Sequence, residues 1–135
     1  MSIPTHADAN LMVELFKLRL DSSMQQAETW FATEFQPGSW EELKVRYPVG
    51  GNEWRMLNMV LGYWEMLGAI IDHNLLSEDL LFDAMESMEI TWDKIKEWLP
   101  SARVEMGPDL WENAELLIQR QHRWRAVRVP KSQRT

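Results

Sequence analysis

The feature that most constrains the fold is the apolar segment between Asn52 and Asn74. Apolar residues and one glycine recur there at alternating steps of three and four, as Trp54, Leu57, Leu61, Trp64, Gly68, Ile71 and Leu75. A second stripe beside it holds Met56, Val60, Leu67 and Ile70. A helix that is apolar over so much of its circumference is buried on most sides. The pattern therefore predicts a central helix at about 52–74, capped by Asn52.

Gly68 lies on the main stripe of this segment, although a glycine inside a helix costs about 1 kcal/mol relative to alanine. Gly62 lies elsewhere on the same predicted helix. A neighbouring helix that approaches closely would explain the glycine at 68. We therefore expect the backbone of another helix to contact the central helix there.

The rest of the chain shows helical periodicity, and the alternation of a β-strand is hard to find. The spacing predicts helices at about 7–35, 39–47, 77 onward, 91–105 and 108–125. The polar residues Asp21-Ser22-Ser23 could bend or interrupt the first, and Pro100 is expected to interrupt or kink the fourth. The prediction is an all-α, single-domain bundle of five or six helices over 1–128, followed by a basic flexible tail at 129–135.

The charge is distributed unevenly along the chain. From Arg120 to Thr135 there are six basic residues and no acidic ones, whereas the preceding residues include 8 basic and 21 acidic side chains, a charge of −13. Such an acidic body disfavours binding of nucleic acid by the domain as a whole. The basic segment could contact phosphate, an acidic protein or the body of its own chain.

Several kinds of site are disfavoured by what the sequence lacks. The 135 residues include no cysteine, so disulfides, thiolate metal sites and cysteine nucleophiles are excluded. No run of about 18 apolar residues predicts a membrane span, and the first residues do not resemble a signal peptide, so a cytoplasmic location is expected. Gly-x-Ser-x-Gly and a glycine-rich phosphate loop are also missing.

Three histidines, His6, His73 and His122, lack a partner at the spacing of metal ligands. We therefore predict no metal site, no cofactor and no catalytic residue. Asp72 and His73 stand at the end of the central helix, where a histidine interacts favourably with the helix dipole. The alternative is a ligand pocket formed by these two residues together with Glu65.

Aromatic residues are abundant, with eight tryptophans among nearly all predicted helices. They either fill the core or line an apolar groove for a partner. Trp40 and Trp124 are the tryptophans that we expect to be exposed. Basic residues surround Trp124, which is a pattern of anionic contacts but also of a helix C-terminus. The interaction candidates are Trp40, Trp124, Arg120, Arg123, Arg125 and Arg128.

One family resemblance rests on Val60-Leu61-Gly62-Tyr63-Trp64-Glu65, the following Asp72-His73-Asn74-Leu75-Leu76-Ser77-Glu78-Asp79-Leu80, Trp92 and Arg103. Over about 53–125 the chain resembles small bacterial all-helical domains of unknown function. In those domains a helix ends in a turn and leads to a helix that contains tryptophan. The resemblance implies an all-helical fold and supplies no catalytic residues.

Three hypotheses for the function follow. The first is a non-enzymatic protein-interaction or self-associating module, with a homodimer as the commonest symmetric form. The second is a small-ligand-binding protein or enzyme with a pocket near His73. The third is a nucleic-acid accessory protein that acts through the basic C-terminal segment.

Overall fold

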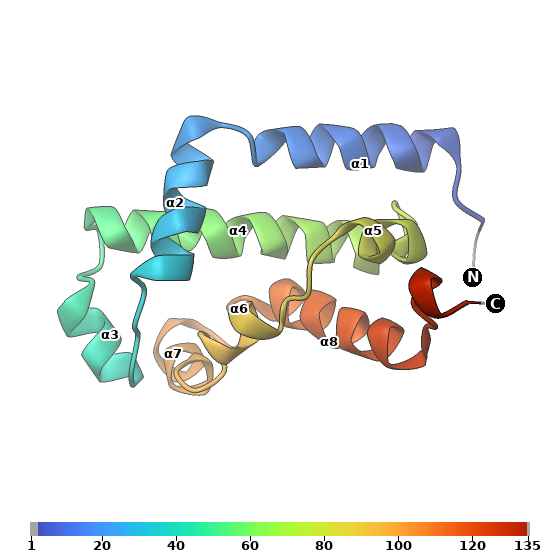
Figure 1. Ribbon diagram of the computed structural model, residues 1–135. Coiled ribbons are helices and arrows are strands. Elements are labelled where there is room, and N and C mark those ends of the chain that lie inside the picture. Colours follow the sequence, from blue (N-terminus) through green and yellow to red (C-terminus); the bar gives the residue numbers. More distant parts are fainter. Residues whose placement is uncertain (1–2, 135) are drawn as a thin grey trace.

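The computed structural model describes residues 3–134, which form an all-α domain without strands in that range (Figure 1). Its elements are α1 (His6–Leu18), α2 (Ser22–Thr33), α3 (Trp40–Arg46), α4 (Asn52–Asp72), α5 (Glu78–Ala84), α6 (Glu89–Asp93), α7 (Leu99–Met106), α8 (Glu112–Val127) and a 3-10 turn η1 (Lys131–Gln133). The predicted fold class is confirmed. The described residues contain eight α-helices instead of five or six, because two expected helices are each divided. None of the eight is long and apolar enough to cross a membrane.

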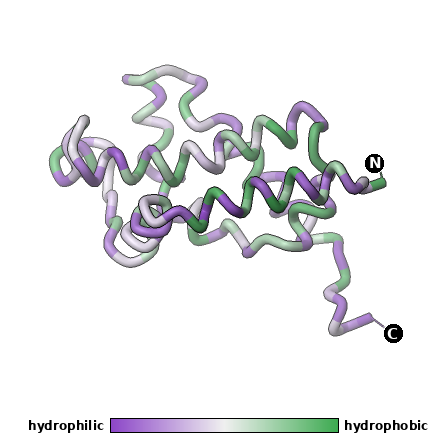
Figure 2. Tube along the Cα trace, turned by 90° about the horizontal axis from the view of Figure 1, so that it is seen from above, coloured by the Kyte–Doolittle hydropathy of each residue, from purple (hydrophilic) through white to green (hydrophobic). Residues whose placement is uncertain are grey.

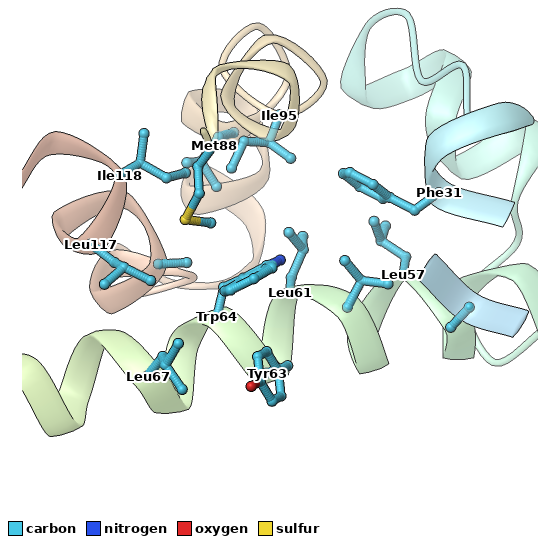
Figure 3. Close-up of a cluster of buried hydrophobic side chains, with 14 of the residues drawn as sticks. Phe31, Leu57, Leu61, Tyr63, Trp64, Leu67, Met88, Ile95, Leu117 and Ile118 are labelled. Carbon is cyan, nitrogen blue, oxygen red and sulfur yellow. The ribbon is translucent and has the colours of Figure 1, made fainter. Parts of the chain in front are cut away.

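Helix α4 is the centre of the fold. It lies between α1 and α8 and is crossed by α2 (Figure 1). Figure 3 shows Leu61, Trp64 and Leu67 of α4 pointing into a cluster that includes Leu117 and Ile118 of α8. These side chains are at most 5 % exposed. The predicted central helix is therefore present, and its main stripe is buried from Leu57 to Ile71, whereas Trp54 at its start is partly buried.

The expected close approach at Gly68 is also present. A Cβ atom at this position would lie 2.0 Å from the backbone oxygen of Asn113, in the first turn of α8. A Cβ atom at Gly62 would meet no neighbouring atom within 4 Å. Only Gly68, of these two glycines, is therefore required by the packing of α8 on α4.

The first expected helix is divided at residues 19–21. The side chain of Asp21 accepts hydrogen bonds from the backbone N–H groups of Ser23 and Met24, and it caps a new helix. Aspartate is favoured at such a position because it satisfies donors that lack a partner in the helix. The turn leaves Leu18 and Leu20 51 % and 70 % exposed, although one continuous helix would place both among the apolar positions of its buried face.

The expected helix at 91–105 is divided as well. Helix α6 ends at Asp93, and α7 begins only at Leu99. Pro100 lies in the first turn of α7, where its missing N–H group costs no hydrogen bond. The expected interruption is therefore present, but it lies before Pro100, and Pro100 itself belongs to the first turn of α7.

Two helix ends also differ from expectation. Gly51, not Asn52, precedes α4 as its N-cap, without a side-chain hydrogen bond. At the other end Asn74 adopts a left-handed conformation (φ 57°), which turns the chain one residue before Leu75. Leu75 is consequently 66 % exposed instead of buried.

Helix α1 is amphipathic and lies at the surface. Hydrophobic and hydrophilic residues alternate along it in Figure 2. Leu15 is its one buried residue, and the hydroxyl group of Tyr63 donates a 2.8 Å hydrogen bond to the Leu15 carbonyl oxygen. At its other end Asp8 accepts hydrogen bonds from the backbone of Thr5 and Ser77, which hold the pKa of Asp8 below its usual range. These contacts attach α1 to α4 and to the start of α5.

Candidate functional site

Glu65, the first pocket candidate, is bonded to the start of α8. Its Oε1 atom accepts hydrogen bonds from the backbone N–H groups of Asn113 and Ala114 at 3.0 and 2.9 Å. Its Oε2 atom accepts from the side-chain amide of Asn113 at 2.9 Å. Trp111, the N-cap residue of α8, is left-handed (φ 55°) and provides no side-chain cap. Glu65 therefore replaces the missing cap from another helix and also offers a negative charge to the helix dipole.

We expect Glu65→Ala to lower the free energy of unfolding by about 1–3 kcal/mol, because buried N–H donors lose their acceptor. Glu65→Gln, which keeps one acceptor oxygen, should cost less. Urea denaturation followed by tryptophan fluorescence measures both. An unchanged midpoint for the alanine variant would contradict a capping role.

Asp72 and His73, the other two pocket candidates, lie two helical turns beyond Glu65. Seven residues along a helix correspond to about 10 Å. Asp72 pairs with Arg120 at 3.5 Å, and His73 is an exposed residue at the end of α4. The structure thus does not bring Glu65, Asp72 and His73 together around one cavity.

A groove of about 590 Å³ lies next to them, between the end of α4, the start of α5 and the second half of α8. We call it the α4–α8 groove. All three segments lie at the end of the molecule that also carries both termini (Figure 1). The groove is lined by Ile71, Asn74, Leu76, Ser77, Glu78, Asp79, Arg120, Arg123, Trp124 and Val127. Its members thus include three of the six interaction candidates predicted from the sequence.

The groove has a buried apolar floor and two rims of opposite charge. Ile71 and Leu76, which are 2 % and 4 % exposed, form the floor. Glu78 and Asp79 form an acidic rim in the first turn of α5. Arg120 and Arg123 form a basic rim on α8. Such a combination can bind an apolar group while its charged rims orient the occupant.

The two arginines of the basic rim differ in their ion pairs. Arg120 lies between Asp72 and Glu78, at 3.5 and 3.6 Å, and donates to the carbonyl oxygen of Ile71. Arg123 is exposed and forms no ion pair within residues 3–134. Arg123 is therefore the cation of this groove that is available to an incoming anion.

Trp124 is half-buried against the acidic rim. Its Nε1 atom donates a 2.9 Å hydrogen bond to Asp79 Oδ1, and its ring packs against Phe82 at 5.9 Å. The guanidinium group of Arg128 lies over the ring, 4.6 Å from its centre. A partly accessible tryptophan with its N–H group satisfied provides apolar contact area at low entropic cost. The expectation that Trp124 reaches the surface is consistent with this placement.

Trp40, in contrast, is 4 % exposed, so our expectation of an exposed side chain was wrong. Its ring stacks on that of Trp98 at 5.8 Å, and its Nε1 atom donates to Glu105. The helix expected at 39–47 is present as α3, and Ser39 caps its start. The start of a short helix is nevertheless covered here by α7, which the sequence pattern does not reveal.

The C-terminal segment contacts the acidic body of its own chain. Arg128 and Lys131 both pair with Asp83 of α5, at 3.9 and 2.8 Å. The hydrogen bond from Lys131 holds the pKa of Asp83 below its usual range. The described chain after α8, which includes η1, runs away from the helices in Figure 2. The flexibility of 129–135 stays a prediction, and Thr135 lies outside the described residues.

A second charged cluster surrounds Arg19, between two shallow hollows of about 540 and 330 Å³. Arg19 pairs with Glu28 and Glu86, and its guanidinium lies 5.1 Å from the Trp64 ring centre. Burial opposes ionisation of Glu86, but the hydrogen bond and the charge of Arg19, together with a backbone hydrogen bond, outweigh burial and lower the pKa of Glu86. Burial also raises the pKa of Tyr63 to about 12. Because these groups satisfy one another, the cluster is a structural connection between α1, α2 and α4.

Among residues 3–134 no three histidine or carboxylate side chains are arranged to hold a metal ion. The residues of the groove that sequence reasoning missed are those of the floor and of the acidic rim. Ser77-Glu78-Asp79 was identified as a helix start, and Ser77 does cap α5. Its position opposite α8 depends on the tertiary packing, for which the sequence carries no local signal.

The comparisons with known proteins identify a family but no activity. The chain belongs to the domain of unknown function DUF4760, whose family model matches residues 4–124. The resemblance to a helical domain family of unknown function is thereby confirmed and extends over almost the whole domain. No curated protein matches the chain, and no solved structure does.

Proposed function

We propose that this member of a domain family of unknown function is a non-enzymatic protein-interaction module that binds its partner in the α4–α8 groove. The observation that carries the proposal is the groove itself. Its apolar floor lies beside Arg123, an exposed cation without an ion-pair partner in the described chain. Interfaces favour aromatic residues and arginine near a desolvated centre, and Trp124 and Arg123 adjoin each other here.

The exposed apolar residues near the groove point to the same conclusion. Val127 lines the groove and is 83 % exposed, and Leu75, next to the lining residue Asn74, is 66 % exposed. Single exposed apolar residues are ordinary, but several beside an apolar hollow are typical of a binding surface. A partner that covered Val127 and Leu75 would remove both from water.

The contacts of the basic segment favour this reading over a nucleic-acid accessory protein. Arg120, Arg128 and Lys131 are paired with carboxylates of the same chain. A phosphate strip would require them to exchange these partners for phosphate close to an acidic body. Arg123, Arg125 and Arg134 form no ion pair within residues 3–134 and provide a short footprint for a polyanion, whose affinity rises with the number of neutralised phosphates.

Site-specific photo-cross-linking tests the proposal. A photoreactive phenylalanine derivative replaces Val127 in the full chain, produced in cells that naturally make it. We expect a discrete adduct, which disappears when Arg123→Glu is added. The matched control replaces Val104, a 90 % exposed valine of α7 far from the groove lining, and should give no adduct. Equal cross-linking at both positions, or none at Val127, would contradict binding in the groove.

A further inference from the structure

We infer that the partner in the α4–α8 groove is a second copy of this chain, bound across a two-fold axis. The inference rests on the proposed function and specifies its partner. It follows from the charges of the two rims, which make the groove complementary to itself.

A two-fold interface joins the same surface of both subunits. Every contact between one residue of the first subunit and another residue of the second therefore occurs a second time with the two subunits exchanged. The α4–α8 groove satisfies this requirement because its acidic rim on α5 faces its basic rim on α8. When a second copy is turned through 180°, its basic rim faces the acidic rim of the first, and the reverse. A groove with two rims of like charge would repel its own copy.

Two groups that can still form hydrogen bonds identify the pair of side chains that would cross the interface. Trp124 donates to Oδ1 of Asp79, and Oδ2 of Asp79 receives no hydrogen bond within the described residues. Arg123, on the opposite rim, has five N–H donors and no acceptor there. Reciprocal pairs between Arg123 and Asp79 therefore need neither side chain to give up a present contact.

The layout of charge along the chain supports the same occupant. Two whole chains, each with a charge of −7, repel one another, but the basic segment after Arg120 is attracted to a body with a charge of −13. Within one chain, Arg128 and Lys131 satisfy this attraction because both form ion pairs with Asp83. Arg123 remains available for the body of another copy. The apolar side chain of Val127, which lines the same groove one helical turn further along α8, would be covered on contact.

Charge exchange provides the test, with the full chain and with molar mass measured by light scattering over a micromolar concentration range. The wild type should pass from 16.0 kDa to twice that mass as concentration rises. Arg123→Glu alone and Asp79→Arg alone should each weaken the dimer about tenfold or more, because like charges meet in both copies of the pair. An equimolar mixture of the two variants should restore the dimer, because both of its pairs then join opposite charges.

Arg125→Glu is the matched control: it makes the same change two residues away, on another face of α8, and should leave the dimer unchanged. Thermal unfolding of each variant shows whether it is folded. Two results would overturn the inference, a wild type that stays at 16.0 kDa at high micromolar concentration and a mixture that fails to associate although both variants are folded. A Val127 adduct with a different protein would also overturn it while leaving the proposed function intact, whereas the lack of any adduct would remove the proposed function itself.

Discussion

Gly68→Ala should destabilise the domain by about 3 kcal/mol or more, which is a large part of the roughly 5–15 kcal/mol that stabilises a typical domain. The added methyl group would lie 2.0 Å from the backbone oxygen of Asn113 and 2.5 Å from its carbonyl carbon. Both are backbone atoms, so no side chain can rotate away. Helix α8 would have to move off α4, and the hydrogen bonds that Glu65 accepts from Asn113 and Ala114 would lengthen.

Gly62→Ala is the control for this prediction, because it makes the same chemical change on the same helix. No atom lies within 4 Å of the position that the new methyl group would take. Alanine is favoured over glycine inside a helix, so this variant should gain about 0.5–1 kcal/mol. Urea denaturation of the two variants under identical conditions measures the difference. If Gly68→Ala were as stable as Gly62→Ala, the packing of α8 on α4 would differ from the one described.

The close approach at Gly68 was predictable because a costly glycine lay on an apolar stripe, where only a packing requirement explains it. The helix that makes the approach was not predictable, since nothing in the local pattern distinguishes α8 from the other helices. The same reasoning applies to the division of the first helix. Asp21 carried a visible capping signal, but an aspartate can either cap a new helix or lie inside a continuous one. Which of the two occurs depends on the tertiary packing of both halves.

The candidate site was predicted from its basic half alone. Arg120, Arg123 and Trp124 were identified because basic residues surround an aromatic residue, which is a local pattern. The acidic half, Glu78 and Asp79, is also local but resembles any first helical turn. Their meeting across a groove brings together residues about 45 positions apart, and sequence spacing says nothing about such distances. Trp40 shows the opposite error, since its place at the start of a short helix beside a loop suggested exposure, whereas α7 covers it.

Leu61→Ala should lower the free energy of unfolding by about 2–5 kcal/mol, the cost of deleting a buried leucine side chain and leaving a cavity. Leu61 is fully buried at the centre of α4, where it faces the same cluster as Trp64 (Figure 3). Close-packed interiors fill such a space only in part, so lost contacts add to the lost transfer free energy. Urea denaturation measures the change, and an unchanged midpoint would mean that the stability of the domain does not depend on this cluster.

Leu75→Ala is the matched control. Leu75 belongs to the same stripe in the sequence as Leu61 but differs from it in burial. Leu61 and Leu75 occupy the same apolar stripe, fourteen residues apart, and sequence periodicity treats them alike. Because α4 ends at Asp72 and Asn74 turns the chain, Leu75 is 66 % exposed and should contribute less than about 0.5 kcal/mol to folding. In the dimer inferred above, however, Leu75 lies near the covered groove. Leu75→Ala should therefore leave the unfolding of the dilute monomer unchanged but weaken association, whereas Leu61→Ala should lower stability at every concentration.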